Sequence, residues 1–515
     1  MGQEAGQPMK AHLLYRDRDL DMAQALPSGS GALVQDLELE TLFGAMAQGD
    51  KAVAAVVRQA VLTSLADVET ILYRQDILKD CLRWEAVVRD MYALLVETIE
   101  VERKNYIGFG FHYPAGMLHR SVDVLQMFFG VLQKLRGLAE QNVDRFESEG
   151  LRALFAMLIA ELSDDYLATI RQHLQRLKFR GGILVSARLG KGNKGEGYVL
   201  RKENAPDNSW IERLLSPRPP AYAFRLPERD EGGARALSEL RDRGITLVAG
   251  ATFQAAHHIT SFIKMLRTEL AFYIGCLNLR RLLTALDEPV CFPVPHTASE
   301  RDHRATGLYD VCLGLSMARK ITGNTVDAKG KDVMIITGAN QGGKSTFLRS
   351  IGLSQVMMQC GMFVPAESFA ANVCERIFTH YRREEDATMS SGKFDEELSR
   401  MNDIAAEVRP NSIVLFNESF ASTNEREGSE IARQVVTALM ERHIKVFFVT
   451  HQYEFAHGLH ARNLPNTLFL RAERQEGGTR TFRICEGVPL VTSYGQDLYA
   501  EIFVGQETAR VAVAR

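Results

Sequence analysis

The chain has 515 residues, of which 46% are apolar and 24% charged, and its formal net charge is −3. This length and apolar fraction allow more than one buried core and predict on the order of two to four domains. The near-neutral charge excludes a globally basic nucleic-acid-binding protein, so any surface for nucleic acid has to be a local patch.

Residues 1–30 carry charges where a secretory signal would carry an apolar block. No uninterrupted apolar run in the sequence reaches the roughly 18 residues that a membrane-spanning helix needs. We therefore expect a cytoplasmic protein that contacts no membrane, and we interpret residues 1–30 as an N-terminal arm.

The sequence from 31 to 300 has a mainly helical pattern. Apolar residues recur at three- and four-residue spacing over 32–101 and 118–177, with few helix breakers. A further predicted helix, over 252–286, is roughly 50 Å long, which suits a lever. We expect residues 31–300 to form an all-α lever and core with a small β-hairpin insertion.

The hairpin is predicted where the period changes, between residues 181 and 202. The segment GGILVSARLGKGNKGEGYVLRK reads as two short strands around a turn of Gly, Lys and Asn. A proline-rich loop is predicted to follow at 216–233. The tip of the hairpin either contacts nucleic acid through Lys191 and Lys194 or is a solvated turn.

Beyond residue 300 strands and helices alternate, which is the pattern of an α/β domain with a parallel sheet. We predict apolar strands at 333–337, 376–381, 412–416 and 445–450, helices at 345–359, 394–408 and 427–442, and a closing antiparallel hairpin at 467–487. The predicted α/β domain therefore covers residues 301–515.

The segment GANQGGKST matches the phosphate-loop pattern G-x-x-x-x-G-K-[ST] between an apolar strand and a helix. Its glycines let backbone amides turn towards phosphate oxygens, and the helix N-terminus adds its positive dipole. We expect Lys344 to reach the β- and γ-phosphates and Ser345 to place its hydroxyl on Mg²⁺, so the cofactors are ATP and Mg²⁺. The predicted nucleotide-binding residues are Gly338, Ala339, Asn340, Gln341, Gly342, Gly343, Lys344, Ser345 and Thr346.

Two other strand ends carry the predicted catalytic residues. Glu418 follows a strand that we expect beside the phosphate-loop strand, where its carboxylate can activate a water in line with the γ-phosphate. His451 ends another strand at the same edge and is predicted to contact the γ-phosphate, with a structural role as the alternative.

Asn417 stands where most ATPases of this build have an aspartate that holds Mg²⁺ through water. An asparagine keeps one acceptor oxygen and loses the negative charge. We therefore expect weaker metal binding and slow hydrolysis, with nucleotide binding retained.

Taken in order, these motifs resemble the ATPase domain of the MutS mismatch-repair family. The phosphate loop has the family's asparagine at Asn340 and its double glycine at Gly342 and Gly343. Further similar segments are GMFVPAES at 361–368, NESFASTNEREG at 417–428, TSYGQDLYAEIF at 492–503 and, for the lever domain, LTSLADVETILYRQDILKDCL at 62–82. The resemblance covers most of the chain and is strongest over 332–503.

The resemblance implies an ABC-type P-loop ATPase in which two subunits face each other and a signature segment of one completes the nucleotide site of the other. The candidate segment is SSGKFDEEL, with Ser391 and Gly392 at a helix N-terminus that suits a γ-phosphate. The sequence of this segment differs from the usual signature sequence of the family. An N-capped surface helix is the other reading, and both can hold together.

The resemblance also implies a DNA clamp, which would be an insertion at about residues 150–240. We see no counterpart of the family's N-terminal mismatch-reading domain or of its nuclease domain, so we expect no direct reading of mismatches by the family's usual Phe-x-Glu wedge. Basic residues in the clamp would contact phosphates independently of sequence, or they form a solvated edge. These residues are Arg176, Lys178, Arg180, Arg188, Lys191, Lys194, Arg201 and Lys202.

Two functions are compatible with the sequence. The first is a homodimeric MutS-like ATPase that couples nucleotide state to DNA binding in repair or recombination, with other repair proteins as further candidate partners. The second is a nucleotide-gated scaffold that binds ATP and partners with little hydrolysis, which Asn417 keeps open. Turnover by the pure protein separates the two functions.

Overall fold

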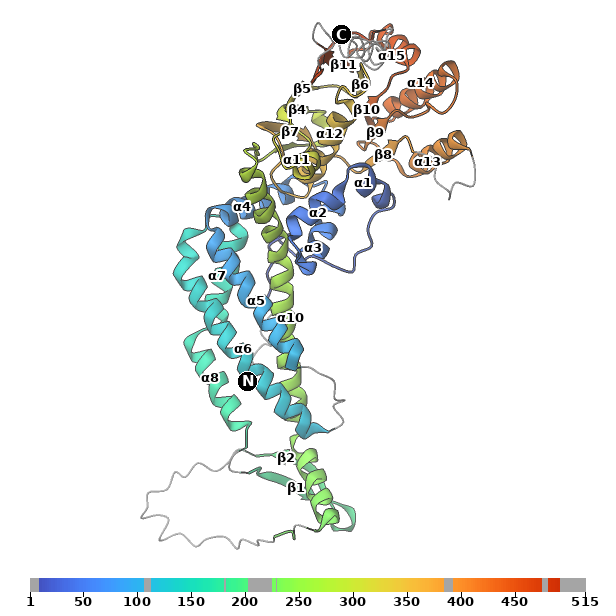
Figure 1. The fold of residues 1–515 in the computed structure, drawn as a ribbon. Helices are drawn as coiled ribbons and strands as arrows, with labels where there is room; N and C mark the ends of the chain where they lie inside the picture. Colours follow the sequence, from blue (N-terminus) through green and yellow to red (C-terminus); the bar gives the residue numbers. More distant parts are fainter. Residues whose placement is uncertain are drawn as a thin grey trace, which may run out of the picture. The chain divides into compact units, whose positions relative to one another are not determined.

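The computed structural model describes residues 9–105, 113–179, 182–201, 225–227, 229–383, 392–474 and 480–490. The chain folds into two compact units (Figure 1). Unit 1 consists of Met1–Ala11, Arg89–Phe146 and Arg152–Arg267, and unit 2 consists of His12–Val88, Glu147–Leu151 and Thr268–Arg515. Each unit therefore combines segments that are far apart in the sequence. The predicted domain boundaries after residues 30 and 300 stay a prediction.

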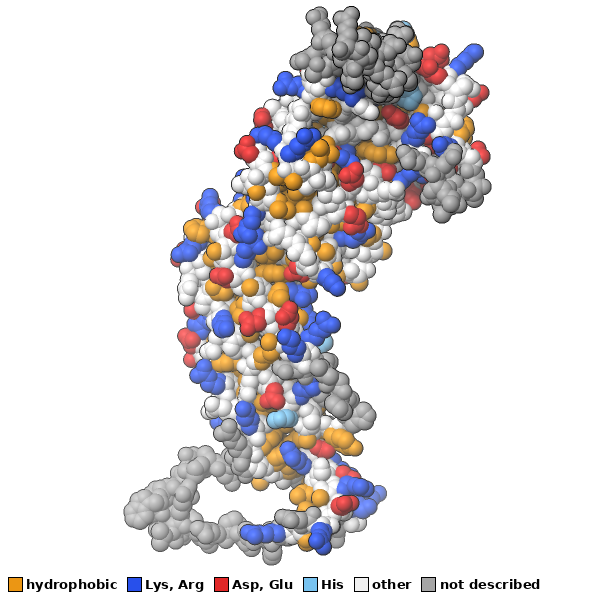
Figure 2. Space-filling view, viewed as in Figure 1, with side chains coloured by type: hydrophobic (Ala, Val, Ile, Leu, Met, Phe, Trp, Pro, Cys, Tyr) orange, Lys and Arg blue, Asp and Glu red, His pale blue; other side chains and the backbone are white. Residues whose placement is uncertain are grey.

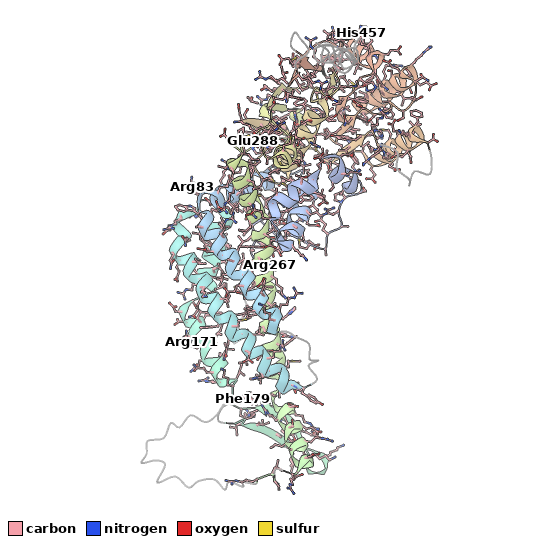
Figure 3. The ribbon with its side chains drawn as sticks, viewed as in Figure 1. Arg83, Arg171, Phe179, Arg267, Glu288 and His457 are labelled. Atoms are coloured by element: carbon pink, nitrogen blue, oxygen red, sulfur yellow. The ribbon has the colours of Figure 1, made fainter. Side chains whose placement is uncertain are left out.

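Unit 1 is mainly helical, as the periodicity predicts. Its elements are α5 (Glu85–Asn105), α6 (Pro114–Asn142), η1 (Val143–Arg145), α7 (Glu149–Glu161), α8 (Asp164–Arg176) and most of α10 (Glu231–Ala285). Ser163 caps α8, because its hydroxyl accepts a hydrogen bond from the amide of Tyr166. A small core of Leu118, Val122, Leu174, Ile245 and Ala249 joins α6, α8 and α10, and Phe179 packs against it (Figure 3).

Helix α10 begins at Glu231, well before the predicted start at residue 252. The prediction relied on a stripe of apolar residues, and most side chains between 231 and 243 are exposed. Because exposed helical turns carry no apolar stripe, periodicity could not detect them. Most of the predicted loop at 216–233 lies outside the described residues.

The predicted hairpin is confirmed in unit 1. Strands β1 (Val185–Leu189) and β2 (Gly195–Leu200) pair antiparallel through Val185 and Leu200 at their outer ends. The short turn η2 (Lys191–Asn193) joins them, with Gly192 at a φ of +69°, which glycine adopts without strain.

Unit 2 begins with four helices: α1 (Ser30–Asp36), α2 (Leu39–Ala47), α3 (Lys51–Leu62) and α4 (Val68–Arg83). Aspartates start two of them, since Asp50 accepts backbone hydrogen bonds at the first turn of α3 and Asp67 does the same for α4. The preceding chain is held by Glu269 of α10. Its carboxylate accepts the amides of Leu13, Leu14 and Leu20 at 2.9, 2.7 and 2.6 Å.

The centre of unit 2 is a six-stranded sheet in the order β12-β11-β6-β10-β9-β8 (Figure 1). Its strands are β6 (Val333–Thr337), β8 (Ile377–Tyr381), β9 (Ile413–Asn417), β10 (Lys445–Val449), β11 (Thr467–Arg474) and β12 (Arg480–Glu486). All neighbours pair in parallel except β11 and β12, which form the predicted closing hairpin. A helical region followed by a mixed α/β domain is therefore confirmed.

One expectation about this sheet is wrong. Strand β10 lies between β6 and β9, so the strand that precedes Glu418 is not beside the phosphate-loop strand. Both β9 and β10 read as buried apolar runs, and such runs predict strands without ordering them. The carboxyl ends of these parallel strands still meet at one edge of the sheet.

Helices cover both faces of the sheet. Helices α13 (Lys393–Glu407), α14 (Glu425–Glu441) and α15 (Tyr453–His460) share a hydrophobic core with β8, β9 and β10. Helix α12 (Lys344–Gln359) packs on β9 and β10, close to Leu415 on the other face. Three of the four helices match the predicted ones within two residues, and α15 was not predicted.

A second sheet of four short strands, in the order β3-β7-β4-β5, was also not predicted. It consists of β3 (Val294–His296), β4 (His303–Leu308), β5 (Asn324–Asp327) and β7 (Ser368–Asn372), with η3 (Ala298–Glu300) and α11 (Val311–Met317) in its connections. Strands of three to six partly polar residues give a hydrophobic pattern that is too weak to predict them from the sequence. No helix within the described ranges is both long and apolar enough to cross a membrane.

Candidate functional site

The phosphate loop follows β6, whose five residues are all buried. The chain then turns through left-handed conformations at Gly338, Gln341 and Gly343, with φ values of +113°, +60° and +90°. A Cβ atom at Gly338 would lie 2.9 Å from the backbone nitrogen of Ala472, so this position requires glycine for space as well as for φ. The loop thus curls tightly against β11 before α12 begins.

Lys344 lies inside the curve of this loop and is only 4% exposed. Its ammonium group donates hydrogen bonds to the carbonyl oxygens of Gly338 and Ala339 at 2.9 and 3.0 Å. Burial lowers the pKa of Lys344 below its usual value, against a smaller opposing effect of the Glu418 carboxylate. A desolvated cation held in a glycine-rich loop is suited to phosphate oxygens.

The two residues predicted to hold Mg²⁺ meet at the edge of the sheet. Ser345 is in the first turn of α12, Asn417 ends β9, and the serine hydroxyl donates to the amide oxygen Oδ1 at 2.9 Å. The described residues include no cluster of three or more His, Cys, Asp or Glu that would hold a metal by itself. Hydroxyl and amide oxygens are ligands that fit Mg²⁺, which usually completes its shell with waters and phosphate oxygens.

Glu418 and His451 also come together from neighbouring strand ends. The Glu418 carboxylate is 4.0 Å from Nδ1 of His451, and both side chains are about one third exposed. The Glu418 amide donates to the carbonyl oxygen of Val449 at 2.9 Å, yet its φ is +54°, a left-handed conformation that costs a non-glycine residue about 1 kcal/mol or more. The backbone therefore holds this carboxylate in a defined place.

A pocket of about 760 Å³ connects the phosphate loop to Glu418, and this volume is in the range of ligand sites. Residues 340–346 line one wall. Sequence reasoning missed the other wall, which is formed by Leu313, Met317, Arg319, Lys320, Ile321, Thr322, Asn324 and Phe482. Its apolar members suit the flat rings of a nucleotide base.

Hydrogen bonds fix this second wall. Asn324 donates to the carbonyl oxygen of Phe482 and accepts the amide of Ile484, which joins β5 to β12. Glu288, which Figure 3 labels, accepts a hydrogen bond from the amide of Ile321. No motif marks these residues, because their proximity comes from packing of the second sheet against β12.

The predicted signature segment is only partly described. Ser391 lies outside the described residues, and Gly392 is the exposed residue before the first turn of α13. Asp395 and Glu396 stand in that first turn, where carboxylates already interact favourably with the helix dipole. The role of Ser391 and Gly392 in a partner's nucleotide site stays a prediction.

Of the basic residues in the predicted clamp, Arg180 and Lys202 lie outside the described residues. The other six are exposed and belong to unit 1: Arg176, Lys178, Arg188, Lys191, Lys194 and Arg201. Figure 2 shows Lys and Arg side chains around the hairpin, interspersed with acidic and hydrophobic ones. This surface is locally basic without being uniformly so.

The parallel sheet with its phosphate loop defines a P-loop nucleotide-binding domain. Two family models match the chain, the MutS2 N-terminal domain over residues 66–286 and MutS domain V over residues 334–510. The chain belongs to the MutS family, as the resemblance of its motifs predicts.

Named relatives agree with this assignment. The chain is 31% identical to MutS protein homolog 4 of Mus musculus over 211 residues, which are 39% of this chain and 22% of that protein. It is 34% identical to DNA mismatch repair protein MutS of Thermotoga neapolitana over 183 residues, 35% of this chain and 22% of that protein. It is 31% identical to DNA mismatch repair protein MutS of Lactobacillus acidophilus over 277 residues, which are 51% of this chain and 31% of that protein. The match thus spans less than a third of each relative.

Proposed function

We propose that this protein binds and hydrolyses ATP with Mg²⁺, acts as a dimer, and couples its nucleotide state to DNA binding in repair or recombination. The observation that carries the proposal is the shared pocket of Lys344, Ser345 and Glu418. Phosphate binding, metal binding and water activation need these three groups close together.

Each group has a distinct role in the proposed reaction. The loop amides and Lys344 bind the β- and γ-phosphates, and Ser345 with Asn417 would hold Mg²⁺, which neutralises charge on the phosphate oxygens. Glu418 orients a water for attack on the γ-phosphate. His451 contacts the γ-phosphate or the Glu418 carboxylate, which lies 4.0 Å away.

The dimer and the DNA-binding parts of the proposal rest on family membership and on the exposed basic hairpin. ATP would bring two ATPase domains together through the segment at Ser391 and Gly392, and hydrolysis would release them. The names of the relatives from Thermotoga neapolitana and Lactobacillus acidophilus place those two proteins in mismatch repair. Light scattering should therefore show a dimer with ATP, and a monomer with both ATP and ADP would contradict the signature role.

A nucleotide-gated scaffold is the second candidate, and the neutral side chain of Asn417 favours it. Such a protein would bind ATP and partners with little turnover. Binding of duplex, mismatched, branched and single-stranded DNA, each with ADP and with ATP, separates the candidates. No preference for any DNA over a salt-matched control would support the scaffold.

Lys344→Ala tests nucleotide binding. The variant loses a charged hydrogen-bond donor to phosphate, so we expect ATP affinity to fall about 10- to 100-fold and hydrolysis to disappear. Equilibrium binding of a fluorescent ATP analogue measures the affinity. The exposed Lys329→Ala of the same unit is the control. Equal affinity and turnover in the two variants would refute the assigned phosphate site.

Asn417→Asp tests the metal site. A carboxylate at this position strengthens the contact to Mg²⁺ by about 1 kcal/mol, so the Mg²⁺ concentration for half-maximal hydrolysis should fall about fivefold. A magnesium titration of ATP turnover measures it. The exposed Asn463→Asp adds the same charge elsewhere and should leave the titration unchanged. An identical magnesium dependence in all three proteins would remove Asn417 from the metal site.

A further inference from the structure

His380 is a buried histidine that connects three elements of unit 2. It stands on β8, next to β9, and both ring nitrogens have close partners. Nδ1 lies 2.7 Å from the hydroxyl oxygen of Ser419, and Nε2 lies 3.0 Å from the carbonyl oxygen of Glu397 on α13. Ser419 directly follows Glu418, so one imidazole joins α13 to the proposed catalytic loop.

The partners define which nitrogen carries the proton. A carbonyl oxygen only accepts, so Nε2 of His380 donates to Glu397. Burial lowers the pKa of His380 to about 4, so the ring is neutral near pH 7 and Nδ1 is an acceptor. The single proton of the Ser419 hydroxyl has two acceptors on His380 within reach, the backbone carbonyl oxygen at 2.6 Å and Nδ1 at 2.7 Å. The Ser419 hydroxyl thus contacts both the side chain and the backbone of His380, while Nε2 of the neutral ring donates to α13.

Other contacts hold the same loop against the same helix. The ring of Phe420 stacks on His380 with centroids 5.3 Å apart, and the hydroxyl of Ser422 donates to the buried carboxylate of Glu397 at 3.1 Å. Phe420 has a φ of +60°, so two residues of this loop, Glu418 and Phe420, are in the left-handed region. Such conformations persist only where surrounding contacts hold them.

We infer that His380 is a positioning residue that ties the loop carrying Glu418 to α13, so that the placement of α13 sets the rate of hydrolysis. The inference rests on the proposed ATP hydrolysis and adds a regulatory contact to that site. Helix α13 begins at Lys393, directly after Gly392 of the segment proposed to face the partner's nucleotide. The same imidazole therefore links the partner's site to this chain's own base. Displacing Glu418 by a fraction of an ångström slows attack without changing the phosphate loop.

Two variants test the link in the full-length protein. His380→Phe keeps the ring volume and the stacking but removes both hydrogen bonds, and Ser419→Ala removes only the hydroxyl. We expect kcat for ATP to fall about 10- to 100-fold in His380→Phe, while ATP affinity stays within about twofold. Ser419→Ala should show the same separation of kcat from affinity.

His303→Phe is a matched control. His303 is equally buried, packs on Phe369 and Phe447, and has no hydrogen-bond partner on either ring nitrogen within the described part of the chain. It should leave kcat within about twofold of the wild type. The bond from the Ser419 hydroxyl to the His380 carbonyl oxygen is kept in His380→Phe and lost in Ser419→Ala, so the double variant should be no faster than either single variant.

The outcomes are distinct. If the wild type hydrolyses ATP and both His380→Phe and Ser419→Ala have its kcat, the inference is overturned and the proposed function stands. If kcat fell as far in His303→Phe as in His380→Phe, the inference would also be overturned, because replacing any buried histidine ring would then slow hydrolysis. If the wild type hydrolysed ATP no faster than Lys344→Ala does, both the inference and the proposed function would be overturned.

Discussion

Glu418→Gln should bind ATP as the wild type does and hydrolyse it about 10²- to 10⁴-fold more slowly, which is the usual contribution of a general base. Glutamine keeps the shape of the side chain and one acceptor oxygen but cannot take a proton from water. The phosphate loop and the Ser345–Asn417 contact do not involve the carboxylate, so affinity should change less than a few-fold. Single-turnover hydrolysis and equilibrium binding measure the two quantities.

The control for this variant is Glu441→Gln at the exposed end of α14. It makes the same chemical change in the same unit, away from the pocket, and should leave turnover unchanged. If Glu418→Gln turned over at the wild-type rate, water activation would have to be assigned to another group. Retained affinity with lost turnover would also yield a trapped ATP state in which the proposed dimer can be measured.

Glu269→Ala should destabilise unit 2 by about 3–5 kcal/mol, because it removes a buried carboxyl group that accepts from three backbone amides. The carboxylate is fully buried and accepts from Leu13, Leu14 and Leu20, so alanine leaves these donors without a partner. Urea unfolding of the variant measures the loss. Glu40→Ala removes an exposed carboxylate that pairs with Arg58 and should cost less than about 1 kcal/mol.

The pH dependence gives this prediction a second readout. Burial raises the pKa of Glu269 to about 7, against the opposing effect of the backbone amides. A raised pKa means that the fold favours the protonated form, so this part of the stability is present below about pH 4.5 and is lost as pH rises through 7. The stability gap between wild type and Glu269→Ala should narrow over that range. Equal stability of the two proteins at every pH would contradict the assigned role.

The sequence predicted the central strands of unit 2 well because parallel strands buried on both faces read as apolar runs. Strand β6 has the predicted bounds, and β8, β9 and β10 differ by single residues. The phosphate loop was equally visible, since its turn needs glycine at Gly338 and Gly343. These features depend on neighbours in sequence, which a pattern can display.

Features that depend on distant neighbours were not predictable. The place of β10 between β6 and β9 is decided by packing of the whole sheet. The pocket wall at Ile321 and Phe482 forms only when β5 meets β12, and the link from His380 to Ser419 crosses two strands. In each case the residues are ordinary for their local element, and only their partners give them a role.

The grouping of residues 12–88 with the C-terminal half affects how the protein is made. Arg74 donates to the carbonyl oxygen of Cys360, and the amide of Leu65 donates to the carbonyl oxygen of Gln359. Residues near the start of the chain therefore find these hydrogen-bond partners only at the end of α12. Loop closure over such distances is slow, and unit 2 cannot finish folding until its last strands leave the ribosome. Until then the contacts of α3 and α4 with α12 and its C-terminal end are missing, which leaves apolar surface of these helices exposed during synthesis.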